Sequence, residues 1–350
     1  VVTSDRDLGD NQPFDDVMLN QWNSLEKCDV MYLSSDNQSI FKISNLVKGS
    51  TFDVIYLNSF FDYNFSIKYL ISRKFGFVQD CPIVLAPRGE FSKGALSIKY
   101  FKKKLFLKIA SFFGLYNGIV WQASSSYEKQ DIIDCFPRSC DSIFIAKDLP
   151  SKLDFSLPDI NYNSSTALRV VFISRISPKK NLDFALKILT LVKADVVFDI
   201  YGPIENIDYW NSCLKIIENM PDHIIVNYCG SLEPDNVGCV FSRYDLFLFP
   251  THGENYGHVI AESLTVGTAV LLSDQTPWRN LKSDSLGWDL SLNDISVFVE
   301  KIELFANYTI EERTLFRFEI IKNASSRVNC SDDILANNEI FKFTIERFYR

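Results

Sequence analysis

The segment LFLFPTHGENYGHVIAESLTVG, residues 246–267, predicts a strand, a polar loop and a helix in immediate succession. The apolar run Leu246–Pro250 is typical of a fully buried strand. The helix is expected to begin near Gly257 and to end at Gly267, because glycine permits a close backbone approach at one end and a cap at the other. A helix N-terminus offers free N–H groups and a positive dipole end, which suit a phosphate or a sugar hydroxyl.

The same alternation of short apolar runs and longer amphipathic stretches continues along the chain, and it predicts βα units with a mainly parallel sheet. The other expected strands are Asp53–Asn58, Ile83–Ala86, Ile119–Ala123, Ser142–Ala146, Arg169–Ser174, Val196–Tyr201, Ile224–Tyr228 and Ala269–Ser273. Residues 148–166 contain two prolines and many Ser, Asn and Asp residues, so they are expected to form a linker. The sequence therefore predicts an α/β protein of two doubly wound domains, with a ligand in the cleft between them.

Composition narrows the functional classes. Of the 350 residues, 47% are hydrophobic and 23% are charged, which is typical of a soluble globular protein. The net charge of −8 argues against a nucleic-acid partner. The eight cysteines form no CxxC pair, so reduced thiols in a cytoplasmic protein are expected. No run of eighteen apolar residues predicts a membrane-spanning helix.

A second segment, VVFISRISPKKNLD at residues 170–183, places cations directly after a strand. Arg175 follows the strand, and Lys179 and Lys180 come just before the next helix. The forked guanidinium of arginine and the point charge of lysine match the oxygens of a diphosphate. A basic turn that only faces water is the alternative for this segment. Glu254 and Glu262 also have two interpretations. They accept hydrogen bonds from a polyol, or they are simply solvated.

Taken together, these motifs resemble the retaining glycosyltransferases of family 4. The Glu-x7-Glu motif of that family is matched by Glu254 and Glu262, and its Arg-x4-Lys pair by Arg175 and Lys180. Further similarities are YGP at residues 201–203, CGSL at 229–232, TPW at 276–278 and APRGEFSKGAL at 86–96, the last shared with enzymes of bacterial surface-polysaccharide synthesis. The resemblance implies the GT-B fold, in which two Rossmann-like domains face each other across a cleft.

The resemblance also implies domain bounds and residue roles. Residues 1–155 form the acceptor-side domain together with a terminal crossover helix at 337–350, and residues 165–336 bind the nucleotide-sugar. Arg175 and Lys180 bind the donor diphosphate and stabilise its leaving charge, Glu254 holds the donor sugar, and Glu262 accepts from the ribose. The other implied donor-binding residues are Gly202, Gly230, Ser231, Leu232, Tyr256, Gly257 and His258.

The implied donor is a UDP- or GDP-sugar and the implied acceptor a saccharide, lipid-linked in many relatives. The donor is a substrate, and the resemblance implies no cofactor. It also implies no metal ion, because Arg and Lys supply the counter-charge, and the three His residues form no HExxH motif.

The turn Arg88-Gly89-Glu90 follows the expected strand Ile83–Ala86 and is assigned to the acceptor or sugar side of the site. Many family members have a His near this position, so Arg88 is a departure. Three roles stay open for Arg88: a polar contact to the donor sugar, a contact to an anionic acceptor, or an ordering of its own loop.

Lysines are concentrated at Lys93–Lys108, which holds six of them and no acidic residue. An apolar face at helical spacing is formed by Ile98, Phe101, Leu105, Ile109 and Phe112. A basic amphipathic helix predicts peripheral docking on an anionic membrane surface, on the inner face of the cell membrane, through Lys99, Lys102, Lys103, Lys104 and Lys108. A helix that packs its apolar face into the core is the alternative.

One departure concerns the start of the sequence. Family members begin with a strand and a glycine-rich loop, whereas Val1–Asp7 looks like a later strand. The first strand is therefore expected to be missing, which leaves an open position in the N-terminal sheet. A truncated or non-catalytic sugar-nucleotide-binding protein is therefore one alternative to a transferase. A GT-B sugar-nucleotide epimerase is a separate alternative. A nicotinamide oxidoreductase is disfavoured because GxGxxG occurs nowhere.

Overall fold

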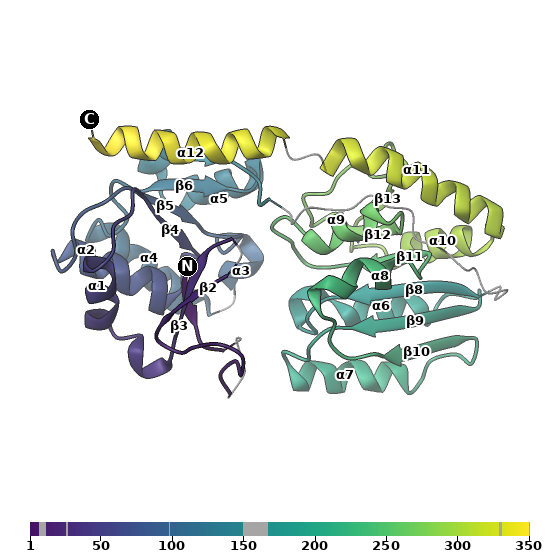
Figure 1. The fold of residues 1–350 in the computed structure, drawn as a ribbon. Coiled ribbons are helices and arrows are strands. Elements are labelled where there is room, and N and C mark those ends of the chain that lie inside the picture. Colours follow the sequence, from purple (N-terminus) through teal and green to yellow (C-terminus); the bar gives the residue numbers. More distant parts are fainter. Residues whose placement is uncertain (7–11, 26, 98, 150–166, 329–330, 350) are drawn as a thin grey trace. The chain divides into compact units, whose positions relative to one another are not determined.

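The computed structural model describes residues 1–6, 12–25, 27–97, 99–149, 167–328 and 331–349. The chain divides into two compact units (Figure 1). The N-terminal unit comprises Val1–Asp148 and Asp332–Arg350, and the C-terminal unit comprises Leu149–Ser331. The expected domain ends at residues 155 and 165, and most of the expected linker, lie outside the described residues.

The C-terminal unit is built on a six-stranded sheet in which all neighbouring strands are parallel. Its strands are β8 (Leu168–Ile173), β9 (Val196–Tyr201), β10 (Ile224–Tyr228), β11 (Leu246–Phe249), β12 (Ala269–Ser273) and β13 (Gly287–Leu290). Their order in the sheet is β10-β9-β8-β11-β12-β13, or 3-2-1-4-5-6 by sequence. The chain therefore reverses its direction of travel across the sheet between β8 and β11, which makes this pair the topological switch point.

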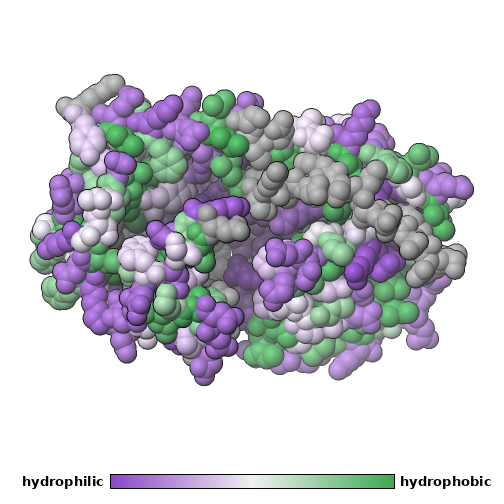
Figure 2. Space-filling model, in the orientation of Figure 1, coloured by the Kyte–Doolittle hydropathy of each residue, from purple (hydrophilic) through white to green (hydrophobic). Residues whose placement is uncertain are grey.

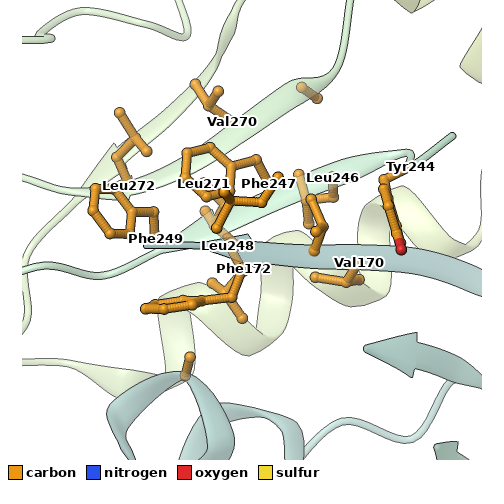
Figure 3. Close-up of a cluster of buried hydrophobic side chains, with 14 of the residues drawn as sticks. Val170, Phe172, Tyr244, Leu246, Phe247, Leu248, Phe249, Val270, Leu271 and Leu272 are labelled. Carbon is orange, nitrogen blue, oxygen red and sulfur yellow. The ribbon is translucent and has the colours of Figure 1, made fainter. Parts of the chain in front are cut away.

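Helices lie between these strands along the chain, and two more follow the last strand. They are η4 (Pro178–Lys180), α6 (Leu182–Leu189), α7 (Ile207–Ile217), η5 (Pro234–Asn236), α8 (Val237–Phe241), α9 (His258–Thr265), α10 (Ile295–Ala306) and α11 (Ile310–Val328). β8, β11 and β12 are buried almost along their whole length, as parallel strands between two helical layers are, whereas β9 and β10 are partly exposed. Figure 3 shows side chains of β8, β11 and β12, among them Phe172, Leu248 and Leu271, gathered in one buried cluster.

The strands of the N-terminal unit form two sheets. The first has the order β1-β3-β2, from β1 (Val2–Ser4), β3 (Asp29–Leu33) and β2 (Trp22–Ser24). The second has the order β4-β5-β6-β7, from β4 (Ile55–Asn58), β5 (Ile83–Ala86), β6 (Val120–Ala123) and β7 (Ile143–Ile145). Both β1 and β4 are edge strands, and a cavity of about 1210 Å³ is lined by residues of both. Among the described residues, one edge of β4 thus pairs with no other strand.

The helices of this unit are η1 (Ser35–Asn37), α1 (Ile40–Lys48), η2 (Tyr63–Ile67), α2 (Lys68–Lys74), α3 (Lys93–Ser97), α4 (Tyr100–Phe112), α5 (Ser126–Cys135), η3 (Pro137–Ser142) and α12 (Ser331–Tyr349). The last helix comes from the C-terminal end of the chain. Its Ile340 is buried against Val84 and Val120 of the four-stranded sheet and against Ala146, which directly follows β7. The implied crossover of the terminal segment is therefore made by α12 (Figure 1).

The sequence predicts most of these strands well. The bounds of β5, β9, β10 and β12 agree with the expected ones, and those of β4, β6, β7, β8 and β11 differ by one or two residues at an end. The strands β2, β3 and β13 were not expected. The expectation of one continuous basic helix at Lys93–Lys108 is wrong: α3 and α4 are separate, and Lys99 between them has a left-handed backbone with φ +57°.

Candidate functional site

The predicted cations and carboxylates of the C-terminal unit lie where β8 and β11 end, at the topological switch point. Arg175 and the turn η4 follow β8, and the loop with Glu254 follows β11. Because β8 and β11 are neighbours in the sheet, their carboxyl ends present these two segments side by side. Residues that are 74 positions apart in sequence are thereby brought into contact.

Lys180 and Glu254 form an ion pair between the Nζ and Oε1 atoms. Each of the two side chains is only 12% exposed, so both charges are largely removed from water. The Lys180 ammonium also lies over the ring of Phe249, 5.5 Å from its centroid. The sequence assigned these two residues to different parts of a donor, whereas the structure pairs them with each other. A ligand that takes up either charge must therefore compete with this ion pair.

Arg175 follows the carboxyl end of β8 and is exposed to solvent. Its side chain is 55% exposed, and its Nη1 atom lies 3.3 Å from Oε2 of Glu205. An exposed pair of this kind contributes little to stability, so the guanidinium can turn to another anion at small cost. Arg175 is thus a cation available to a ligand, whereas Lys180 is held in place.

Gly202 shows why glycine follows β9. It has φ +134°, and a Cβ atom at this position would lie 2.0 Å from the carbonyl oxygen of Ser174. Its N–H donates to the carbonyl of Gly230 at 2.8 Å, which connects the ends of β9 and β10. Gly202 therefore permits the close approach of the backbone to the segment that carries Arg175. Of the residues that follow Gly230, Ser231 is exposed and Leu232 packs partly against the core.

The loop from Glu254 leads into α9, as the sequence predicts. Gly257 has φ +81° directly before His258, the first residue of the helix. The Tyr256 side chain is buried against Trp278, and the indole Nε1 of Trp278 donates to the Tyr256 carbonyl at 2.7 Å. The Tyr256 ring thus belongs to the core, and this residue offers a ligand its backbone only.

Glu262 lies on α9, one turn after the helix begins, with a half-buried side chain. Burial raises the pKa of its carboxyl above the ordinary value of 4.5. A carboxylate that has lost part of its hydration gains more from a hydroxyl donor than a fully solvated one does. This environment suits a contact with a polyol.

In the N-terminal unit, the turn after β5 is held by two acidic side chains. The carboxylate of Glu90 accepts hydrogen bonds from Ser59 Oγ at 2.9 Å and from the N–H groups of Phe60 and Phe61 at 2.6 and 3.0 Å. Glu128 accepts from the Gly89 N–H at 2.5 Å. Glu90, which the sequence assigned to the acceptor or sugar side, therefore has a structural use in the described chain.

Arg88 has a left-handed backbone with φ +58° and three polar contacts within its unit. Its Nε donates to Asn58 Oδ1 at 2.6 Å, its Nη2 donates to the Tyr56 hydroxyl at 3.0 Å, and its Nη1 forms an ion pair with Asp148. These contacts order the loop, the third of the roles that the sequence leaves open. Arg88 also lines the cavity between β1 and β4.

The helix α4 turns its predicted apolar face outward. Phe101 and Phe112 are 84% and 85% exposed, and Leu105 and Ile109 are exposed as well. The alternative of a core-packed apolar face is therefore wrong for these four residues, and Ile98 lies outside the described residues. Lys99, Lys102, Lys104 and Lys108 are exposed.

Lys103 differs from the other lysines. It is half-buried, lies over the ring of Phe61 and donates to the Ala95 carbonyl at 2.8 Å. Burial lowers its pKa. Lys103 is therefore less available than the other four lysines to a membrane surface, and its assignment to the membrane-facing set stays a prediction.

Two kinds of feature are absent from the described residues. Within the described ranges, no helix combines the length and apolar character that crossing a bilayer requires. In the same part of the chain, no group of three or more His, Cys, Asp or Glu side chains is arranged to hold a metal ion. On the face that Figure 2 shows, hydrophilic and hydrophobic residues are interspersed.

Comparison with known proteins gives a consistent result. Residues 159–317 match the family model described as "Glycosyl transferases group 1". The chain is similar to HepE of Anabaena, solved in complex with UDP and glucose, with a TM-score of 0.65 and 17% identity over 90% of this chain and 85% of that chain. The chain has the GT-B fold. The residues that match the group 1 family model lie in its C-terminal unit.

Two further similarities extend over most of the chain. The "lipopolysaccharide outer core galactosyltransferase WaaB" has a TM-score of 0.55 and 13% identity over 89% of this chain and 84% of that chain. A Klebsiella pneumoniae relative, named "Uncharacterized 41.2 kDa protein in cps region", is 22% identical over 320 residues, 89% of this chain and 84% of its own. The group 1 domain contains Arg175, Lys180, Glu254 and Glu262, so the switch-point site belongs to the matched part of this GT-B chain.

Sequence reasoning gave no role to three residues that shape this site, Asn181, Glu205 and Trp278. It also gave none to Glu128, which holds the turn after β5 in the N-terminal unit. The pairing of Arg175 with Glu205 and the support of Tyr256 by Trp278 join segments that are distant in sequence. Of these residues, only Asn181 had a local sequence signal, because an asparagine directly before a helix is a typical N-cap residue.

Proposed function

We propose that this protein is a retaining glycosyltransferase of family 4 that transfers a sugar from a nucleotide-sugar to a saccharide acceptor. The observation that carries the proposal is the juxtaposition of Arg175, Lys180 and Glu254 at the carboxyl ends of β8 and β11 in a 3-2-1-4-5-6 sheet. A switch point of this kind is where open α/β sheets bind nucleotides. There, Arg175 and Lys180 bind the diphosphate, and the carboxylates of Glu254 and Glu262 accept hydrogen bonds from hydroxyl groups.

In the proposed reaction, the bond between the anomeric carbon and the diphosphate oxygen breaks, and a bond from that carbon to an acceptor hydroxyl oxygen forms on the same face of the sugar. The acceptor proton leaves with the departing diphosphate. Arg175 and Lys180 stabilise the negative charge that develops on the leaving group, and Glu254 holds sugar hydroxyls. Since these cations supply the counter-charge, we propose that the reaction needs neither a metal ion nor a cofactor.

For the donor we propose a UDP-sugar before a GDP-sugar. The support is that HepE was solved with UDP and glucose and also with UDP-glucose. The ribose contact is assigned to Glu262, and the contacts to the base and phosphates to the backbone around Gly202, Gly230–Leu232 and Gly257–His258. The Tyr256 contribution is limited to its backbone, because its ring is buried.

For the pathway we propose surface-polysaccharide synthesis with a lipid-linked acceptor, at the inner face of the cell membrane. The support is the name of the Klebsiella relative, which places it in a cps region, and the name of WaaB. The outward apolar face of α4 and its exposed lysines support a peripheral contact with anionic lipid. Each lysine near such a surface contributes about 1 kcal/mol at low salt.

The donor is tested by thermal unfolding with UDP-, GDP- and ADP-sugars. A ligand at about 100 times its dissociation constant adds roughly 2.7 kcal/mol, which is a measurable rise in Tm. The stabilising donor is then incubated with saccharide acceptors, and product is followed by mass spectrometry, with and without a chelator. A donor that changes without any acceptor would make the protein an epimerase, and stabilisation without product would make it a non-catalytic binder. Stabilisation by none of the donors contradicts the proposal.

The membrane contact is tested by sedimentation with phosphatidylcholine vesicles that contain or lack phosphatidylglycerol. We expect binding to the anionic vesicles only, at low salt, with a loss in the double variant Phe101→Ser/Phe112→Ser. The matched control is Leu315→Ser, which removes a large exposed side chain from α11 in the other unit. Equal recovery of the double variant and the unaltered protein contradicts a role for the α4 face.

A further inference from the structure

Asn181 uses its side chain in an unusual way for its position. It occupies the N-cap of α6 with φ +61° and ψ +40°, and its side chain makes no capping hydrogen bond. An asparagine at an N-cap normally accepts from an N–H of the first helical turn. Here Nδ2 instead donates to the carbonyl of Pro250, 2.8 Å away, and the residue is only 5% exposed. The amide thus connects the start of α6 to the end of β11.

The residue on the other side of Lys180 is tied to the same loop. The Lys179 carbonyl accepts from the His252 N–H at 2.9 Å and from the Thr251 hydroxyl at 3.1 Å. Both sequence neighbours of Lys180 are therefore hydrogen-bonded to residues 250–252, four positions or fewer before Glu254. This arrangement fixes the backbone that carries Lys180 against the backbone that carries Glu254.

We propose that Asn181 is a positioning residue of the donor site, an inference that rests on the proposed function. Its amide holds the turn of Lys180 against the loop after β11, so that the ammonium stays where the donor diphosphate arrives. A lysine side chain has four carbons of flexible stem, and a fixed starting point limits the volume that its ammonium explores. A cation that is already in place costs less ordering when the ligand binds.

Asparagine meets two demands here that few residues meet together. The left-handed backbone favours Gly, Asn or Asp over other residues. The Pro250 carbonyl requires a donor, which Gly lacks and which an ionised Asp cannot supply. The variants Asn181→Gly and Asn181→Asp therefore separate the backbone demand from the hydrogen bond. Asn280 is a matched control, because it has a similar backbone with φ +59° but is exposed and is distant in sequence from both Lys180 and Glu254.

Two measurements test the role of Asn181. The first is the Kd of UDP, GDP and ADP by calorimetry. We expect binding of the preferred nucleotide to weaken roughly 3- to 10-fold in Asn181→Gly, the range of one lost hydrogen bond, more in Asn181→Asp, and not at all in Asn280→Gly. The second is the rate at which an amine-reactive acylating reagent labels Lys180, read by mass spectrometry. We expect faster labelling in both Asn181 variants and an unchanged rate in the control.

A double-mutant cycle decides whether Asn181 acts through Lys180. In a Lys180→Ala background, Asn181→Gly should have no further effect on nucleotide affinity. The same loss in both backgrounds would overturn the positioning role, as would unchanged labelling of Lys180 in Asn181→Gly. Failure of UDP, GDP and ADP to bind the unaltered protein would count against the proposed donor, and the labelling rate then still decides the role of Asn181 by itself.

Discussion

The ion pair between Lys180 and Glu254 leads to the prediction that removing one of its charges increases nucleotide affinity. If the donor diphosphate takes up Lys180, binding must separate two charges that are each 12% exposed. Glu254→Gln keeps the size of the side chain and removes its charge. We expect this variant to bind a nucleoside diphosphate more tightly than the unaltered protein, although it removes a residue of the site.

The magnitude follows from the burial of the pair. Breaking a fully buried ion pair costs 3–5 kcal/mol, because one charge is left uncompensated, whereas exposed pairs are worth about 0.2–1 kcal/mol. The pair is nearly buried, and glutamine can still accept a hydrogen bond from Lys180. We therefore expect the free energy of unfolding to fall by about 1–2 kcal/mol. A diphosphate that restores a partner to Lys180 recovers this energy, which corresponds to roughly 5- to 30-fold tighter binding.

The assay combines calorimetry with UDP and GDP, chemical denaturation and steady-state kinetics. Turnover should fall in Glu254→Gln even as nucleotide affinity rises, because contacts to the sugar that strengthen in the transition state affect kcat. The control is Glu300→Gln, which removes the exposed acidic partner of Lys301 on α10. It should leave all three measurements unchanged.

The opposite result would refute the reasoning. If folded Glu254→Gln binds UDP and GDP with unchanged or lower affinity, Lys180 does not exchange Glu254 for a diphosphate. The lysine would then have a structural use only, and Arg175 would be the remaining cation of the site.

Three further predictions concern single residues. Arg175→Ala should weaken nucleoside diphosphate binding about tenfold or more in calorimetry, with little change in stability because its pair with Glu205 is exposed. Burial raises the pKa of Glu262 above 4.5, so the folded state holds this proton more tightly and loses stability as the pH rises from about 4.5 through the folded-state pKa. Denaturation of Glu262→Gln at pH 4 and pH 7 should therefore show a smaller loss than in the unaltered protein, and its KM for the donor should rise more than its kcat falls. Gly202→Ala places a Cβ atom 2.0 Å from the Ser174 carbonyl oxygen and should lower the free energy of unfolding by more than about 2 kcal/mol, whereas Gly230→Ala meets no atom within 4 Å and pays only the cost of a left-handed backbone, about 1 kcal/mol.

The sequence alone determined the α/β class and the central strands. β5 and β12 are contiguous apolar runs because they are buried on both faces, and such runs are visible without a structure. β9 and β10 are partly exposed, and their β-branched and aromatic residues marked them as strands. The Arg-x4-Lys and Glu-x7-Glu spacings likewise located both loops of the switch-point site. In contrast, β2 has only three residues with a mostly exposed pattern, so it left little signal to predict.

Tertiary structure decided which partners and which faces these residues have. Helical spacing marked an apolar stripe on α4, but the hydrophobic pattern does not state which stripe the unit buries, and Phe101 and Phe112 proved to face outward. Lys180 contacts Glu254, and Asn181 contacts Pro250, only because β8 and β11 are neighbours in the sheet. Strand order is set by how whole elements pack. A contact between residues about 70 positions apart therefore cannot be predicted from the local sequence pattern.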